Sequence, residues 1–143
     1  MSTEVHHWTG GKEPDPKHSF GFIYLITNLI DGRMYVGKKQ YSFTRYIKEP
    51  HRKTRRKVIV PSNWEQYMGS SKYLHKDIKK FGKENFKFEI IWNCETKGML
   101  HWMEIKELVL RNCLLAQLEG SDLPLYYNRS IAGIKFIPKG KVK

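Results

Sequence analysis

Two tyrosines near the start of the chain are spaced to form a polar pocket on an apolar sheet. Tyr24 lies in one apolar run and Tyr35 in the next, with the turn residues 29–32 between them. Antiparallel pairing across this turn places Tyr24 opposite Gly37 and diagonal to Tyr35 on one sheet face, about 7 Å away between Cα atoms. Because glycine has no side chain, space opens beside two phenols that could transfer protons or orient water. Tyrosine is common in strands, so ordinary packing is the alternative interpretation.

Glu104 is a second candidate for chemistry. On a helix its neighbours four positions away are Leu100 and Leu108, so the carboxylate lies close to an apolar stripe. A carboxylate on such a face is unusual unless it is paired with a cation or binds a metal. Both explanations remain open at this point.

The excess positive charge is confined to two segments. The formal net charge of the 143-residue chain is +12, of which residues 38–57 carry +8 and residues 135–143 carry +4. A chain this basic points to a polyanionic partner, since neutralising phosphates releases counterions and favours binding. A solvated loop and a solvated tail are the alternative. Ribosomal, RNA-binding and DNA-cleaving proteins all fit the charge alone.

Several other chemistries are disfavoured by spacing. Cys94, His101 and Cys113 lack the paired ligand spacing of a zinc site, and two cysteines cannot build a disulfide framework. We therefore expect a reducing compartment. No glycine-rich phosphate loop of the P-loop type is present, and no spacing suggests a Cys/His protease.

The elements that must position these residues form a small α/β (α+β) domain. Alternation and β-branched content predict strands, helix caps predict two helices, and their order predicts a three-stranded, mainly antiparallel sheet flanked by helices. The expected strands are residues 20–27, 33–37 and 86–91, and the expected helices are 72–81 and a long one from Thr96 to near Gly120.

Outside these elements we expect little regular structure. Residues 1–19 are expected to be a flexible arm, 20–134 a single domain, and 135–143 a basic tail. Residues 38–60 are expected to begin as helix or loop and to continue as an exposed basic excursion. With no apolar run of about 20 residues and no secretory signal, we expect a soluble cytoplasmic protein without a membrane partner.

These features together resemble the GIY-YIG nuclease family. Phe22-Ile23-Tyr24 is followed, after ten residues, by Tyr35-Val36-Gly37; Arg45 lies eight residues beyond that glycine, Glu104 in a later helix, and Asn128 after it. Two further segments resemble those of phage-encoded Seg-type members: Gly69-Ser70-Ser71-Lys72 and Gly82-Lys83-Glu84-Asn85-Phe86. The first triplet departs from the pattern, because its glycine is displaced to Gly21.

The resemblance implies a DNA endonuclease that hydrolyses phosphodiester bonds with one divalent cation. Glu104 would hold Mg²⁺ or Mn²⁺, and Arg45 would bind non-bridging oxygens of the scissile phosphate. Tyr24 would accept a proton from the attacking water. Since a free phenol has a pKa of about 10, Lys38 or the metal would have to lower that pKa.

The resemblance also assigns supporting roles. Tyr35 and Asn128 would orient water or phosphate. Many relatives carry a histidine one helical turn after the arginine, where this chain has Glu49; participation of His51 or His75 stays open.

The DNA surface expected from the charge pattern is a set of ten cations. They are Lys38, Lys39, Arg45, Arg52, Lys53, Arg55, Arg56, Lys57, Lys72 and Lys76. We expect low specificity, or specificity from residues 38–60, from a protein partner or from an oligomer. A homing role and a stand-alone nuclease both fit. The alternative functions are a non-catalytic nucleic-acid-binding protein on the same fold and a basic RNA-binding protein.

Overall fold

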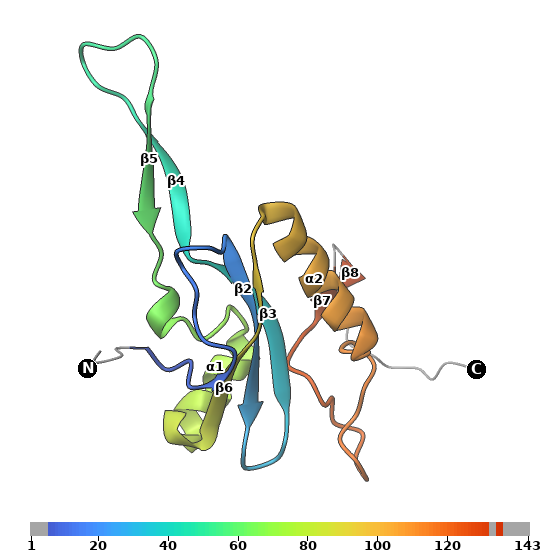
Figure 1. Cartoon of the computed structure of the whole chain (residues 1–143). Coiled ribbons are helices and arrows are strands. Elements are labelled where there is room, and N and C mark those ends of the chain that lie inside the picture. The colour runs from blue at the N-terminus through green and yellow to red at the C-terminus, as the bar shows by residue number, and fades with distance from the viewer. Residues whose placement is uncertain (1–5, 132–133, 136–143) are drawn as a thin grey trace.

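A mixed sheet forms the centre of the molecule. The computed structural model describes residues 6–131 and 134–135 (Figure 1). Three long strands, β2 (Gly21–Asn28), β3 (Met34–Gln40) and β6 (Phe86–Cys94), and the two-residue strand β1 (Gly10–Gly11) lie in the order β1-β6-β2-β3. β2 pairs antiparallel with β3 and with β6, whereas β1 pairs parallel with β6. The predicted α+β class and three-stranded antiparallel core are confirmed, and β1 is an addition at the sheet edge.

The β2–β3 hairpin has the predicted register. Tyr24 pairs with Gly37 and Ile26 pairs with Tyr35. Gly32 has a φ of 85° in the connecting turn, a conformation that favours glycine. Local turn chemistry and alternation were therefore sufficient to place both tyrosines on one face.

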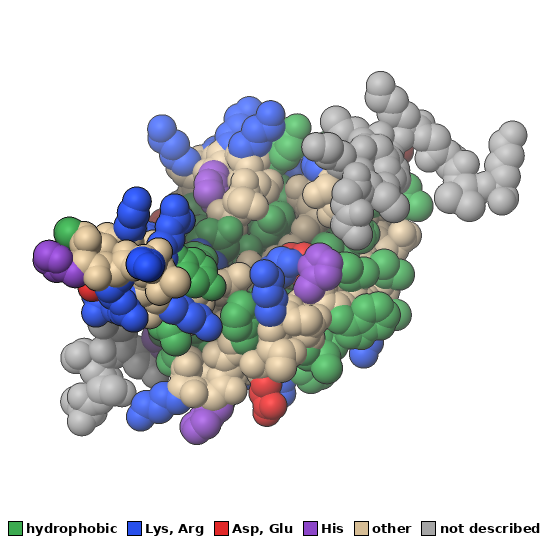
Figure 2. Space-filling model, turned by 90° about the horizontal axis from the view of Figure 1, so that it is seen from above, with side chains coloured by type: hydrophobic (Ala, Val, Ile, Leu, Met, Phe, Trp, Pro, Cys, Tyr) green, Lys and Arg blue, Asp and Glu red, His purple; other side chains and the backbone are tan. Residues whose placement is uncertain are grey.

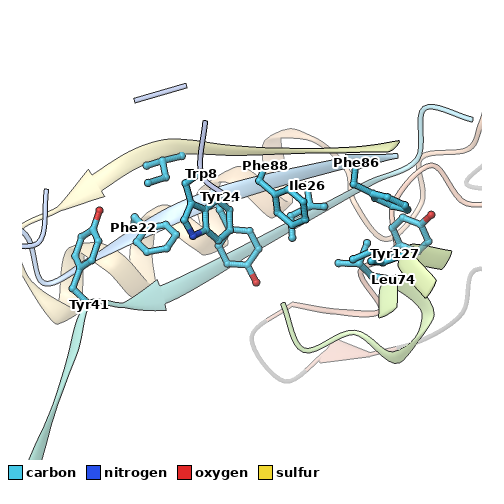
Figure 3. Packing of buried hydrophobic residues seen from close by; sticks show 11 residues of the cluster. Trp8, Phe22, Tyr24, Ile26, Tyr41, Leu74, Phe86, Phe88 and Tyr127 are labelled. Carbon is cyan, nitrogen blue, oxygen red and sulfur yellow. The ribbon is translucent and has the colours of Figure 1, made fainter. Parts of the chain in front are cut away.

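Two helices cover opposite faces of the sheet. Phe22, Tyr24 and Ile26 of β2 pack with residues of α1 (Lys72–Phe81), whereas Ile23 between them packs with residues of α2 (Lys97–Leu110). Successive strand residues point to opposite faces, so this alternation assigns each helix to its own side. Figure 3 shows the aromatic cluster of the α1 side, in which Trp8 lies between Phe22 and Tyr24.

Helix α1 begins and ends where its sequence signals predict. The Ser71 hydroxyl accepts a hydrogen bond from the Leu74 amide, and Gly82 ends the helix with a φ of 92°. Short 3₁₀ helices precede and follow it at Trp64–Gln66 and Lys83–Asn85.

Helix α2 is shorter than predicted. It ends at Leu110, because Asn112 adopts a φ of 53° and the Cys113 amide turns back to the Leu108 carbonyl. Together with the bond from the Asn112 amide to Val109, this is a Schellman-type stop with asparagine in place of glycine. The leucines at 114, 115 and 118 extended the apparent stripe beyond the true helix end.

The flexible arm predicted for residues 1–19 is wrong for the described part, residues 6–19. Trp8 is 2% exposed, and its indole Nε1 donates to the Trp64 carbonyl at 2.7 Å. Strand β1 adds two ladder positions against β6. The polar composition of this segment hid the single tryptophan that anchors it in the core.

The basic excursion is a β-hairpin. β4 (Ser42–Ile47) pairs antiparallel with β5 (Arg56–Pro61), and the ribbon projects away from the central sheet (Figure 1). The helix or loop expected at its start is therefore wrong. Cross-strand pairing of β-branched residues at 58–60 with 43–45 supports the ribbon without an apolar core.

The last described residues lie beside α2. Two short strands, β7 (Ser130–Ile131) and β8 (Ile134–Lys135), pair with each other, and most of the predicted basic tail lies outside the described residues. None of the helices in the described ranges has the length and apolar character needed to cross a bilayer.

Candidate active site

A cavity of about 350 Å³ opens at the β3 edge of the sheet. β3 is the last strand, so side chains from both faces can converge around its edge. Tyr35 reaches the cavity from the sheet, Glu104 from α2, and Ser70, Ser71 and Lys72 from the start of α1. The remaining lining residues are Val36, Tyr73, Leu108, Tyr127, Asn128, Arg129 and Ser130.

Tyr24 lies beneath this cavity, not in its wall. The side chain is 1% exposed, and its ring centroid is 6.1 Å from that of Tyr35. A Cβ atom at Gly37 would overlap the Tyr24 hydroxyl, and one at Gly69 would lie 2.9 Å from the Tyr35 ring and 3.2 Å from the Tyr24 hydroxyl. The two glycines therefore form the gap that the hairpin register predicted, although sequence reasoning identified only Gly37.

Both phenols are held in the neutral form. Burial raises the pKa of Tyr24 well above its ordinary value, and the potential negative charges of Tyr35, Tyr67 and Glu104 raise it further. Burial likewise raises the pKa of Tyr35, whose hydroxyl lies 3.3 Å from Ser70 Oγ. Lys38, expected to lower the pKa of Tyr24, faces Glu104 instead.

Glu104 sits in a small cluster of ionisable groups. Lys38 Nζ lies 3.8 Å from Glu104 Oε1 and 2.9 Å from His101 Nδ1. Burial raises the pKa of the Glu104 carboxyl, and the nearby charges of Lys38 and His101 act in the opposite direction. Sequence reasoning considered His101 only as a zinc ligand, although its spacing of three from Glu104 already placed both side chains on one helix face.

Glu104 could hold a divalent cation that is shared with a substrate. No group of three or more His, Cys, Asp or Glu that could enclose a metal occurs among residues 6–131. Mg²⁺ is commonly bound through one or two carboxylates, with waters and substrate phosphates completing its shell. A single carboxylate, 22% exposed and facing an open cavity, fits that mode of binding.

Asn128 holds the edge of β3. Its amide nitrogen donates to the Val36 carbonyl at 2.7 Å, and its amide oxygen accepts from the Val36 amide at 3.0 Å. The preceding residues pair with Met34, so the side chain continues a strand-like contact along β3. The geometry supports a positioning role for Asn128, because both of its polar atoms are occupied by backbone groups.

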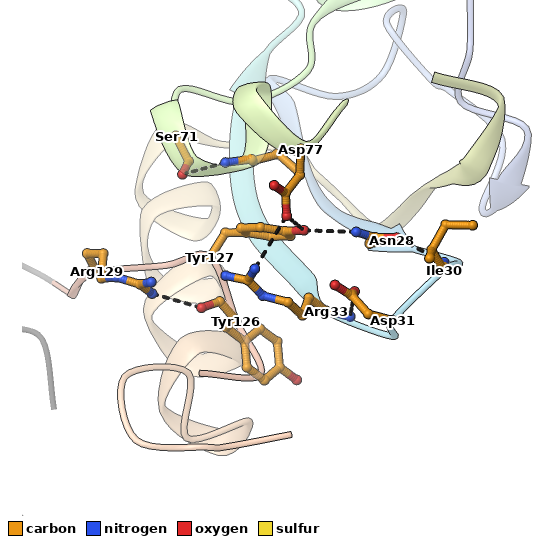
Figure 4. Close-up of polar contacts among 10 residues, drawn as sticks. Asn28, Ile30, Asp31, Arg33, Ser71, Asp77, Tyr126, Tyr127 and Arg129 are labelled. Carbon is orange, nitrogen blue, oxygen red and sulfur yellow. Dashed lines mark hydrogen bonds and ion pairs between the residues drawn. The ribbon is translucent and has the colours of Figure 1, made fainter. Parts of the chain in front are cut away.

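A buried polar network connects this edge to α1 (Figure 4). Tyr127 donates to Asp77 at 2.7 Å and accepts from Asn28 at 3.1 Å, and Arg33 reaches the same Asp77 oxygen at 3.3 Å. The Arg33 guanidinium also lies 4.3 Å from the Tyr127 ring centroid. The network fixes Tyr127 and hence the neighbouring Asn128.

A known protein family matches most of this chain. A family profile described as "Putative endonuclease segE, GIY-YIG domain" matches residues 5–131. This chain belongs to the GIY-YIG endonuclease family. It is also 31% identical over 93 residues to "Putative endonuclease segD" of Enterobacteria phage T4, a match that covers 62% of this chain and 33% of that protein. No solved structure matches the chain.

In this GIY-YIG domain neither His51 nor His75, whose participation the sequence left open, lines the edge cavity. His75 Nε2 lies 2.8 Å from the Gly69 carbonyl and 3.1 Å from that of Met68. It therefore supports the turn that shapes the Tyr24 gap. His51 is exposed in the turn of the β4–β5 hairpin.

Arg45 also lies away from the edge cavity of the GIY-YIG domain. It is exposed on β4, opposite Val58, and is not among the residues that line the cavity. The structure thus brings together Tyr24, Tyr35, Lys38, Glu104 and Asn128, and leaves Arg45 on the ribbon.

The remaining predicted DNA contacts lie on β3, on the β4–β5 hairpin and its turn, and on α1. Figure 2 looks down on the hairpin end of the molecule, where Lys and Arg side chains surround the hairpin and outnumber acidic ones. Lys38, Lys39 and His101 line a second cavity of about 280 Å³ between the hairpin and α2. Lys39 Nζ lies 4.2 Å from the Tyr67 ring centroid and 5.1 Å from that of Phe43. Of the predicted contacts, those on the hairpin are all exposed, namely Arg45, Arg52, Lys53, Arg55, Arg56 and Lys57, and Lys72 and Lys76 lie on α1.

Proposed function

We propose that this domain is a divalent-metal-dependent DNA endonuclease of the phage homing or stand-alone type. The observation that carries the proposal is the convergence of Glu104 and Tyr35 on one cavity at the β3 edge. A half-buried carboxylate beside two neutral phenols has no evident structural use, since its contact with Lys38 is long.

Glu104 would hold Mg²⁺ or Mn²⁺ in this cavity. When bound, the cation would polarise the scissile phosphate, stabilise the departing oxygen and lower the pKa of nearby acids. The ammonium of Lys38 would then stay close to the developing negative charge. His101, at 2.9 Å from Lys38, would hold the ammonium in place.

Tyr24 and Tyr35 would handle the proton of the attacking water. Tyr35 lines the cavity, and Tyr24 lies behind it with the two ring centroids 6.1 Å apart. The water would hydrogen-bond to Tyr35, and Tyr24 would accept its proton in the phenolate form, after the phenol proton of Tyr24 has left through Tyr35 to solvent. Since burial and the Glu104 carboxylate both raise these pKa values, forming the phenolate requires the positive charge of a cation held by Glu104.

The β4–β5 hairpin would bind the duplex. A two-stranded ribbon fits the major groove, which is about 12 Å wide. The exposed cations of the hairpin would neutralise phosphates on either side, and the cavity lined by Lys38 and Lys39 would lead the backbone toward the β3 edge. Specificity would then come from the ribbon or from a protein partner.

Cleavage assays test the proposal directly. Purified protein with Mg²⁺ or Mn²⁺ should cut plasmid or linear duplex DNA, with single-stranded and branched DNA as comparison substrates and with the ends mapped. Glu104→Gln, which keeps the shape of the side chain, is the matched control and should be inactive. Tight binding without cleavage under either metal would instead favour the non-catalytic nucleic-acid-binding alternative.

A further inference from the structure

Arg129 occupies the edge cavity that Arg45 does not reach. It lines this cavity together with Glu104, Tyr35 and Lys72. Sequence reasoning gave Arg129 no role, because it lies directly after Asn128 and outside the basic segments. Its guanidinium lies 4.9 Å from the Tyr73 ring centroid.

The protein positions this guanidinium but does not neutralise it. Arg129 Nη1 donates to the carbonyls of Tyr126 at 2.9 Å and Asn128 at 3.0 Å. Its Nε is shielded from solvent and has no acceptor within the described part of the chain. No carboxylate forms a salt bridge with Arg129 among the described residues, whereas neighbouring Arg33 is paired with Asp77.

A buried arginine donor without an acceptor is costly in a finished site. Leaving such a group unpaired destabilises the fold, and a charged donor costs more than a neutral one. The Nε of Arg33 is also buried without an acceptor, but its guanidinium is paired with the Asp77 carboxylate, whereas Arg129 has no carboxylate partner among the described residues. The two backbone carbonyls fix one side of the guanidinium and thereby fix the direction of the remaining donors.

The opposite wall of the cavity also favours an anion. It is formed by the start of the ten-residue helix α1, with Ser70, Ser71 and Lys72. The positive end of the helix dipole and the Lys72 ammonium act in the same direction as Arg129. Glu104 is the one acid among the residues that line the cavity.

We infer that Arg129 and the start of α1 form a phosphodiester-binding subsite next to Glu104, and that Arg129, in place of Arg45, contacts the scissile phosphate. The inference rests on the proposed nuclease function. An arginine can bind two phosphate oxygens at once, which suits the charge that develops during hydrolysis. A phosphate held between Arg129 and Lys72 would face Glu104 across the same cavity, so a cation on Glu104 could touch its oxygens. Arg45 would serve the duplex backbone outside.

Phosphate binding tests the subsite without any need for cleavage. Inorganic phosphate is titrated at constant ionic strength into metal-free protein while the arginine Nε–H signals are followed by NMR. We expect the Arg129 signal to shift with saturation, and Arg129→Lys to weaken phosphate binding about 10- to 100-fold, as expected for a charge-assisted contact. Arg45→Lys is the matched control and should leave the titration unchanged. An Arg129 signal that does not respond to phosphate would overturn the inference.

The single-turnover cleavage rate distinguishes a catalytic role of Arg129 from a merely structural one, which would change stability as well. With duplex affinity and melting temperature measured in parallel, Arg129→Lys should slow cleavage about 10- to 100-fold at saturating DNA while both stay close to wild type. Arg45→Gln, which removes the charge, should instead weaken duplex binding and lower the saturated rate much less than Arg129→Lys does. The reverse pattern would return the catalytic role to Arg45. If wild-type protein cuts no DNA yet phosphate still shifts Arg129, the nuclease proposal fails and the subsite stands.

Discussion

The edge cavity and the β4–β5 hairpin use charge in different ways. In and beside the edge cavity a few ionisable groups are half-buried and held by specific partners: Arg129 by two carbonyls, and Lys38, next to the cavity, by His101 and Glu104. In the hairpin many cations are exposed on a ribbon. Fixed charges in a partly dry site can stabilise one particular arrangement of atoms, whereas exposed charges act over distance and are screened by salt.

Under the proposed function, this contrast would separate DNA binding from catalysis. The hairpin would supply sequence-independent affinity, and the cavity would supply rate. Changes in the two regions should therefore move different measured quantities, and the following variants examine whether they do.

The largest effect is expected at Glu104. Glu104→Gln removes the negative charge without changing the side-chain volume, so metal-dependent cleavage should fall about 10³-fold or more. Duplex affinity without metal should stay within a few-fold of wild type, and the fold should be preserved. A variant that cuts at the normal rate would show that Glu104 is simply the ion-pair partner of Lys38.

A smaller loss of rate is expected at Tyr24. Tyr24→Phe removes only the hydroxyl in the gap between Gly37 and Gly69, and the loss of a proton acceptor typically costs about 10²- to 10⁴-fold. The single-turnover rate at saturating DNA is the quantity to measure, with Tyr35→Phe as the companion variant. Tyr35→Phe should be milder if Tyr35 orients the water, and equal losses would indicate that the two phenols act as a unit.

Substitutions in the hairpin should change the affinity for duplex DNA and leave the cleavage rate at saturating DNA unchanged. Replacing Arg52, Lys53, Arg55, Arg56 and Lys57 by glutamine should raise the dissociation constant and flatten its salt dependence, by about 0.9 in the log–log slope for each phosphate that the variant no longer neutralises. The fold should tolerate the change, since these side chains are exposed. If the dissociation constant of this variant depends on salt as in the wild type, the hairpin does not contact DNA phosphates.

The smallest effect at neutral pH is expected at His7, which supports the sheet behind the cavity. Its Nε2 donates to the Tyr67 carbonyl at 2.8 Å, its ring stacks on Phe88, and burial lowers its pKa to about 4 from 6.5. Between pH 6.5 and 4 the unfolded chain therefore binds a proton that the folded chain excludes, so stability is present above 6.5 and falls as the pH falls.

Denaturant unfolding across this pH range checks the effect of His7. The expected loss for the wild type is about 2–3 kcal/mol from this group, at up to about 1.4 kcal/mol per pH unit. His7→Gln keeps a hydrogen-bond donor and does not titrate, so its unfolding free energy should decline less over the same range. Parallel curves for the two proteins would show that His7 is not the group responsible.

The sequence predicted those features that depend on neighbouring residues. The register of Tyr24 against Gly37 follows from the turn between two alternating runs, and the ends of α1 follow from Ser71 and Gly82. The convergence of Tyr35 and Glu104 was predicted by family resemblance. Its position at a sheet edge was not, because edge position depends on the strand order of the whole sheet.

Features decided by distant contacts escaped prediction. Trp8 is buried by residues more than fifty positions away, and the ribbon at 42–61 forms from a segment without clear periodicity. Asn128 was expected to face water or phosphate, but its amide is occupied by the backbone of Val36. No sequence pattern singled out Arg129, because the role proposed for it depends on which of its guanidinium donors lack acceptors in the folded chain.

The pairing of β1 with β6 has a consequence for the order in which the chain can assemble. Residues 10–11 leave the ribosome first, yet their ladder partners at 89–90 follow almost eighty residues later. Until then Trp8 lacks its contact with Phe88, although Trp64, whose carbonyl it binds, has already been made. Contacts this distant in sequence form late and slow folding. The growing chain would therefore expose its basic ribbon well before Glu104 and Asn128 exist, so that a nascent chain could hold nucleic acid before it could cut it.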